Sequence, residues 1–224
     1  MDLDGDGRTD MISGSWPGEI YVFSRKPNGT FSIPEKLKSN LMSVLHVGRA
    51  SAVAAADWDG DADLDLIVGN IDGQVWLLSN EGTKQKPSFG RKEQLKVKGQ
   101  PIVAEGGDAG PCVADWDGDG KLDLILGSGS GAVLWYRNVG TATKPELAAP
   151  VTLIEKAKDP WEGRADLKRS CVRSKPTVVD WNGDGRQDLL VGDFVSVGKT
   201  REDRELHGWV WVYLQKTIVT AKAD

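Results

Sequence analysis

The chain has 224 residues, with 27 glycines, nine tryptophans and a formal net charge of −5 at pH 7. This length allows one substantial core or a set of stacked repeats, and the glycine and tryptophan content favours turn-rich β structure. The chain contains no run of 18 or more apolar residues, so no membrane-spanning helix is predicted.

An acidic nine-residue motif opens the chain at 2–10 and returns at 57–65, 115–123 and 180–188. Each copy has Asp or Asn at positions 1, 3, 5 and 9 and a glycine at position 4, which is typical of a loop around a hard cation such as calcium. The same residues form ordinary solvated turns, but four copies with one spacing favour calcium loops. The predicted ligands are Asp2, Asp4, Asp6 and Asp10; Asp57, Asp59, Asp61 and Asp65; Asp115, Asp117, Asp119 and Asp123; and Asp180, Asn182, Asp184 and Asp188.

The helix-loop-helix calcium hand is a poor match, because it needs a bidentate Glu at position 12. That position holds Ser13, Val68, Leu126 and Val191. A short apolar run ending in glycine follows the last three motifs, at 66–69, 124–127 and 189–192. Runs of this length, bounded by turn residues, predict buried strands. The motifs are therefore expected to connect strands.

A turn and a second strand with aromatic residues follow in each unit, at 18–23, 73–78, 131–136 and 208–213. Apolar segments at 52–56, 112–114 and 177–179 precede three motifs, and weaker strands are predicted near 94–97 and 151–154. Four antiparallel strands per unit, with motifs 55, 58 and 65 residues apart, predict an all-β fold of the β-propeller type. The predicted blades are 1–45, 46–101, 102–156 and 170–224, with insertions at 159–175 and 193–207.

Tryptophan occupies position 2 of the last three motifs, as Trp58, Trp116 and Trp181. Position 2 alternates with the ligand positions, so these rings are expected to point away from an ion. We predict that they pack between blades.

The acidic motif followed by Asp-Leu-Ile-Val-Gly resembles the FG-GAP or VCBS repeat family, over nearly the whole chain. Residues 13–18 and 173–180 are similar to secreted, planctomycete-type members of that family. The resemblance implies a calcium-bearing propeller with up to four Ca²⁺ ions, as in integrin α-subunit blades, and a secreted, periplasmic or cell-surface location. In the family pattern the backbone carbonyl of position 7 is a further ligand, which here belongs to Arg8, Asp63, Lys121 and Arg186.

Two motifs depart from this pattern. The second has Ala62 at position 6, where a Cβ costs roughly 1 kcal/mol if the backbone needs a positive φ, and an extra acid at Asp63. The effect on calcium affinity could have either sign. The fourth motif has Asn182 in place of an Asp, which leaves three carboxylates and predicts weaker calcium binding than in the third motif.

The first motif has no strand before it, and Met1 stands directly against it. About 14 strands are expected where a closed four-blade ring would have 16, so we expect the chain to be an N-terminally truncated or partial propeller. A signal peptide and at least one blade would then precede it. An open arc would expose strand edges, which invite pairing with another chain.

The resemblance also implies that ligands meet the face opposite the acidic loops, which would be built here from 16–19, 70–73, 105–110, 128–131 and the two insertions. The insertions carry Arg164, Lys168, Arg169, Arg173, Lys175, Lys199, Arg201 and Arg204 near Trp161. This cluster could hold a sulfated or carboxylated glycan, although interspersed acids favour ordinary surface loops. The motifs hold sixteen of the 33 acidic residues, so the net charge reflects empty metal loops. No nucleic-acid partner is predicted.

We therefore predict a binding or scaffolding module for a protein or a polysaccharide. Catalysis is not expected, because His46 and His207 have no sequence-adjacent partner and no nucleophile elbow or phosphate loop occurs. A polysaccharide lyase or hydrolase, or a purely structural blade array, remains the alternative. Cys112 and Cys171 are the only cysteines, and no disulfide is assigned to them.

Overall fold

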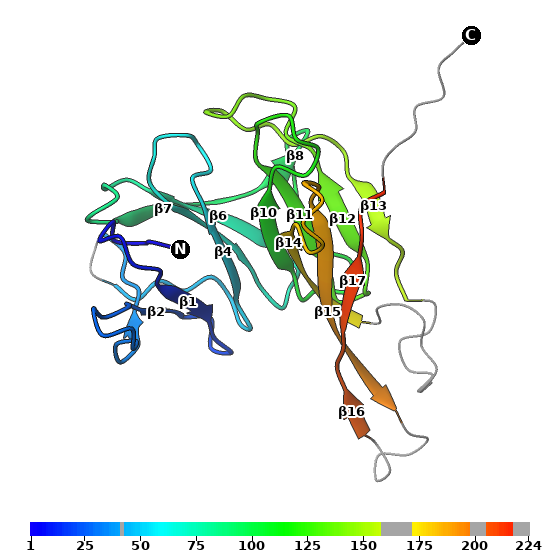
Figure 1. Cartoon of the computed structure of the whole chain (residues 1–224), viewed down its shortest axis with the longest axis horizontal. Helices are drawn as coiled ribbons and strands as arrows, with labels where there is room; N and C mark the ends of the chain where they lie inside the picture. Colours follow the sequence, from blue (N-terminus) through cyan, green and yellow to red (C-terminus); the bar gives the residue numbers. More distant parts are fainter. Residues whose placement is uncertain (41–42, 158–171, 198–204, 217–224) are drawn as a thin grey trace.

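The chain folds into β-sheets throughout the part that the structure describes. The computed structural model describes residues 1–40, 43–157, 172–197 and 205–216, which contain 17 β-strands and no helix. Four sheets follow one another along the chain and are arranged as the blades of a β-propeller (Figure 1). The predicted fold class is thus confirmed. With no helix among these residues, none is available to span a bilayer.

The strands of each blade are hydrogen-bonded mostly in chain order. The first blade contains β1 (Met11–Gly14), β2 (Ile20–Phe23) and β3 (Glu35–Lys36), and the second contains β4 (Ala52–Ala56), β5 (Asp65–Gly69), β6 (Val75–Asn80) and β7 (Phe89–Gln94). The third contains β10 (Gly110–Ala114), β11 (Asp123–Gly127), β12 (Val133–Tyr136) and β13 (Val151–Ile154), and the fourth β14 (Val172–Val179), β15 (Asp188–Val197), β16 (Glu205–His207) and β17 (Val210–Tyr213). A separate hairpin consists of β8 (Lys96–Val97) and β9 (Gln100–Pro101).

Two segments differ from the expected strands. The outer strand of the second blade is β7 at 89–94 instead of a strand near 94–97, because the buried Phe89 pairs with Asn80 while Lys96 and Val97 turn away to pair with β9. In the insertion at 193–207, β15 runs on to Val197 and returns as β16, so its described residues form a hairpin. Residues 159–171 of the other insertion lie outside the described residues. Its last residues, 172–175, form the start of β14.

Register places three acidic motifs at one end of the blades. The first strand of a blade ends opposite the position-9 aspartate that begins the second strand, in the pairs Ala56–Asp65, Ala114–Asp123 and Val179–Asp188. These motifs are therefore hairpin loops, and the first motif ends at Asp10, directly before β1. At the other end of the same strand pairs lie Ala52–Gly69, Gly110–Gly127 and Lys175–Gly192.

The hydrophobic core lies between neighbouring blades. Side chains alternate between the two faces of a strand, so the second strands of the second and third blades each contribute to two clusters. In the second blade, Leu66 and Val68 pack toward the first blade and Ile67 toward the third. The third cluster joins Ile125 and Val133 to Leu189 and Val191 of the fourth blade. Burial of such aliphatic side chains, at about 1.5–3 kcal/mol each, holds successive blades together.

The outward face of the fourth blade has no sheet against it among the described residues. Val210 is 68% exposed, whereas its equivalents Val75 and Val133 are 0% exposed. The same difference applies to the motif tryptophans: Trp58 is 3% exposed within the cluster between the second and third blades, but Trp181 is 60% exposed. Packing between blades is therefore confirmed for Trp58 and wrong for Trp181, because the covering side chains come from the following blade.

Candidate metal centres

Each acidic motif curls through two left-handed residues, at positions 4 and 6. Both positions have φ between 68° and 84° in every copy. Seven of these eight residues are glycines, and the eighth is Ala62, at φ 76°. The sequence-based expectation that position 6 needs a positive φ is confirmed. In the first two loops this curl accompanies convergence of the carboxylates at positions 1, 3 and 5.

The strain at Ala62 gives a matched pair of substitutions. We expect Gly120→Ala, at the same position of the third loop, to lower the free energy of unfolding by about 1 kcal/mol. Space does not limit it, because a Cβ on Gly120 would meet nothing within 4 Å. Ala62→Gly should raise the free energy of unfolding by a similar amount. Urea titrations of both variants check the signs, and a stabilising Gly120→Ala would contradict the assigned backbone strain.

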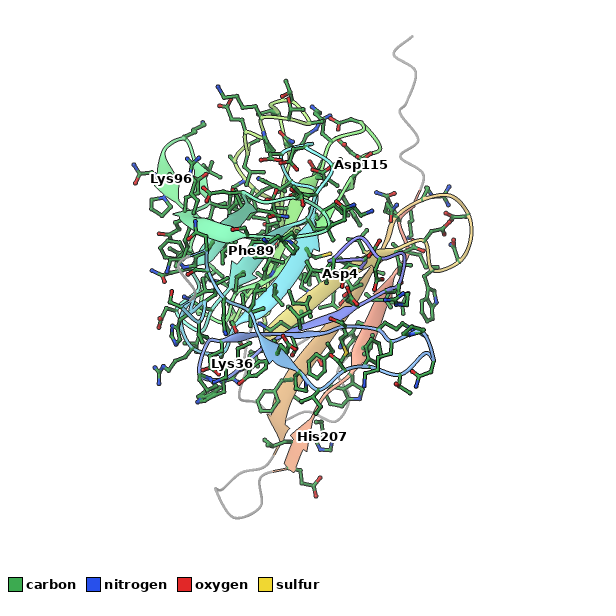
Figure 2. All side chains as sticks on the ribbon, turned by 90° about the vertical axis from the view of Figure 1, so that its left-hand side faces the viewer. Asp4, Lys36, Phe89, Lys96, Asp115 and His207 are labelled. Carbon is green, nitrogen blue, oxygen red and sulfur yellow. The ribbon has the colours of Figure 1, made fainter. Side chains whose placement is uncertain are left out.

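Three of the four loops bring carboxylates together. One oxygen from each member lies within 4.8 Å of the others in the sets Asp2, Asp4 and Asp6; Asp57, Asp59 and Asp61; and Asp115, Asp117 and Asp123. Figure 2 places Asp4 and Asp115, from the first and third loops, above His207 at the far end of the fourth blade. The fourth loop has only two carboxylates at positions 1, 3 and 5, and Asn182 donates to Asp184 over 2.9 Å.

The position-9 aspartates, predicted as ligands, have a structural role that the motif pattern did not predict. In all four copies this carboxylate is buried. It accepts one hydrogen bond from the backbone N–H of position 2 of its motif. It accepts another from a backbone N–H at the end of β2, β6, β12 or β17, or within two residues after it. Asp123 accepts from Trp116 N at 3.3 Å and Asn138 N at 2.7 Å, and from Trp135 Nε1 at 2.9 Å. Asp10, Asp65 and Asp188 each make the two equivalent backbone contacts. This aspartate is therefore a brace that ties the loop to its sheet.

The sequence is compatible with the brace but does not single it out. Position 9 is Asp in all four copies, as are positions 1 and 5, whereas position 3 varies to Asn. A ligand position tolerates that exchange, because the amide retains an oxygen. A carboxylate that accepts from several N–H donors does not, because the amide nitrogen of Asn would face a donor.

Position 7 separates the loops by charge. Its cation pairs with the position-5 aspartate in three loops, as Arg8–Asp6, Lys121–Asp119 and Arg186–Asp184. Arg137 adds contacts of 2.6 Å to Asp117 and 3.1 Å to Asp119. The hydrogen bond from Lys121 holds the pKa of Asp119 below its usual value. At position 7 of these loops the side chain is a cation, so this residue can offer an ion only its backbone carbonyl oxygen.

The second loop has five carboxylates and, among the described residues, no basic side chain paired with them. Buried oxygens of Asp57, Asp59 and Asp63 accept no hydrogen bond. Burial, followed by repulsion from Asp61, raises the pKa values of Asp59 and Asp63, and burial raises that of Asp65 to about 6. Burying a carboxylate oxygen without a hydrogen-bond partner or a bound cation lowers the stability of the fold. An all-oxygen donor set of this kind fits a hard divalent cation.

A protein-family comparison matches the chain in three overlapping segments. The family model described as FG-GAP-like repeat matches residues 2–68, 57–126 and 115–191. Each match begins at position 1 of one acidic motif and ends in the strand after the next.

Similar proteins were also found among curated sequences and solved structures. Cartilage acidic protein 1 of Xenopus tropicalis is 29% identical over 145 residues, and that of Mus musculus is 28% identical over 141 residues. Each alignment covers 57% of this chain and 20% of the relative, so the matched region spans about a fifth of these relatives. A solved structure, from work on recognition of non-reducing terminal N-acetylglucosamine by an Agrocybe aegerita lectin, has a TM-score of 0.46 and 18% identity. That similarity covers 95% of this chain and 56% of the lectin chain, and no ligand is inferred from it.

Proposed function

Because the chain belongs to the family of FG-GAP-like repeat proteins, we propose that it is a calcium-stabilised β-propeller that serves as a binding or scaffolding module of a secreted, periplasmic or cell-surface protein. One observation carries the calcium assignment: three loops at the same end of the blades gather carboxylates, and buried oxygens of Asp2, Asp57, Asp59 and Asp63 have no hydrogen-bond partner. The ligand of the module would be a protein or a polysaccharide.

The role assigned to the loops is structural. Bound calcium would supply the positive charge that lets the carboxylates at positions 1, 3 and 5 stay close together. The chain itself contributes the loop curvature at positions 4 and 6 and the brace at position 9. These features join the strand before each loop to the strand after it. Calcium binding would then add directly to the free energy of folding.

The loops are proposed to bind calcium unequally. The second should bind most tightly, because its five carboxylates have no internal cation. The third has four carboxylates, but Lys121 and Arg137 already pair with two of them. The fourth should bind most weakly, because Asn182 replaces a carboxylate and Arg186 pairs with Asp184.

Calcium removal tests the proposal. With free calcium at a hundred times the dissociation constant, each independent site should add about 2.7 kcal/mol to the free energy of unfolding. We expect thermal and urea unfolding to shift to markedly lower temperature and concentration in excess chelator, and calcium to restore the transition. Magnesium at the same concentration is the control, because its smaller octahedral shell suits these loops poorly. Identical unfolding curves with chelator and with calcium would refute the assignment.

A further inference from the structure

A connection between blades recurs three times at the end of the propeller opposite the acidic loops. Ala50, Asp108 and Arg173 each lie two residues before the first-strand residue that pairs with the glycine of the second strand, and each is left-handed, with φ of 50°, 52° and 56°. Their backbone N–H groups donate to the preceding blade, to Trp16 O at 2.9 Å, Ile71 O at 2.9 Å and Gly129 O at 3.2 Å. This conformation is uncommon for residues with a Cβ.

The shared backbone geometry directs three different side chains toward one pocket. The pocket has a volume of about 550 Å³ and is lined by all four blades. The first blade contributes Ser15 and Trp16, the second Ala50 to Ala52, the third Asp108, and the fourth Arg173, Lys175 and residues 192–194. This volume lies within the usual range for small-ligand sites. Equivalent backbone positions thus carry a methyl, a carboxylate and a guanidinium group.

The walls of this pocket hold a guanidinium group in position. Lys175 Nζ donates to Asp108 O at 2.8 Å and Asp108 Oδ1 at 3.1 Å. Arg173 lies over the ring of Phe194, with 5.5 Å from Cζ to the centroid, and its Nε is 3.6 Å from Asp108 Oδ2. The Arg173 side chain is 52% exposed and donates no hydrogen bond within the described residues.

The rest of the lining complements this cation. Trp16 is 63% exposed, so the pocket is bordered by an accessible indole. Asp193 is the other acid in the lining, and its two oxygens accept hydrogen bonds from Trp209 N at 3.0 Å and Trp211 Nε1 at 2.8 Å. Its carboxylate is therefore engaged on the side of β17. Asp108 likewise pairs with Lys175 and lies beside Arg173 Nε, so a ligand would meet the exposed part of one guanidinium, one ammonium that already donates to Asp108, and one aromatic face.

We propose that this pocket binds the carboxylate of an acidic sugar, with Arg173 as the bidentate partner, Lys175 as a second positive charge and Trp16 as the surface against which the sugar ring packs. Guanidinium groups match carboxylates in two parallel hydrogen bonds. An exposed ring beside them suits the apolar face of a pyranose better than an extended acidic peptide. The proposal rests on the binding-module function, whose ligand class it specifies.

Titration calorimetry in saturating calcium tests this site, with a hyaluronan tetrasaccharide as probe. Chitotetraose is the matched neutral sugar, because it lacks the carboxylates, and hexaglutamate is the matched acidic peptide. We expect binding of the hyaluronan fragment and at least tenfold weaker binding of the other two. Equal binding of chitotetraose, preference for hexaglutamate, or no binding of any probe would each overturn the proposal.

Two glycine substitutions separate recognition from folding. Arg173→Gly removes the guanidinium from a left-handed position that glycine adopts easily, so the fold should persist while affinity falls at least tenfold. Lys98→Gly also replaces a left-handed cation with glycine, in the turn between β8 and β9 and outside the pocket lining, and should leave affinity unchanged. An unaltered affinity in Arg173→Gly would also overturn the proposal. Calcium-dependent unfolding, measured on the same samples, distinguishes failure of this site from failure of the proposed calcium-stabilised module.

Discussion

Asp123→Asn is expected to lower the free energy of unfolding by about 3 kcal/mol, and to do so even in excess chelator. Asp123 is fully buried and accepts from Trp116 N, Asn138 N and Trp135 Nε1. In the variant an amide nitrogen would face at least one of these donors, and each buried donor left without an acceptor costs about 1–3 kcal/mol. Urea unfolding with and without calcium measures the loss.

Asp119→Asn is the control within the same loop. Asp119 is paired with Lys121 and Arg137 near the surface, so its substitution should weaken calcium binding and change the calcium-free protein little. If Asp123→Asn were harmful only when calcium is present, Asp123 would be a ligand without the bracing role. Loss of stability in both conditions is the outcome that the hydrogen bonds predict.

Asp63→Lys should have opposite effects on the calcium-free and the calcium-bound protein. It places in the second loop the cation that the other loops have at position 7, where Lys121 lies 2.9 Å from Asp119. Without calcium, relief of carboxylate repulsion should raise the free energy of unfolding by about 1 kcal/mol. With calcium, binding at the second loop should weaken at least tenfold, because a fixed positive charge competes with the ion.

Lys121→Asp is the reciprocal change in the third loop. It should destabilise the protein in chelator and make the stability depend more strongly on calcium. Calorimetric titration gives the number and affinity of the sites, and urea unfolding in chelator gives the calcium-free stability. If Asp63→Lys destabilised the calcium-free protein, charge repulsion would not be the dominant property of the second loop.

Local features of this chain were predictable because they depend on neighbouring residues. The alternation of ligand and non-ligand positions in 57–65 predicted a loop, and the apolar run at 66–69 predicted a buried strand. The structure has the loop between β4 and β5, and the apolar run lies in β5. The left-handed Ala62 was likewise predictable, because three glycines occupy the equivalent position. The repeat spacing predicted blades, since each unit needs a neighbour to bury its apolar face.

Tertiary structure decided whether residues at equivalent motif positions have the same role. Trp58 and Trp181 share a motif position, but among the described residues only Trp58 is buried against the following blade. Asp123 could be recognised as a brace only once Asn138, fifteen residues away, was placed against it. Trp16, Asp108 and Arg173 belong to three of the segments expected on the ligand face, but only the folded structure places them in the lining of one pocket. Spacing along the chain specified the loops and strands, because those depend on local backbone geometry; burial, charge pairing and the pocket depended on contacts between blades.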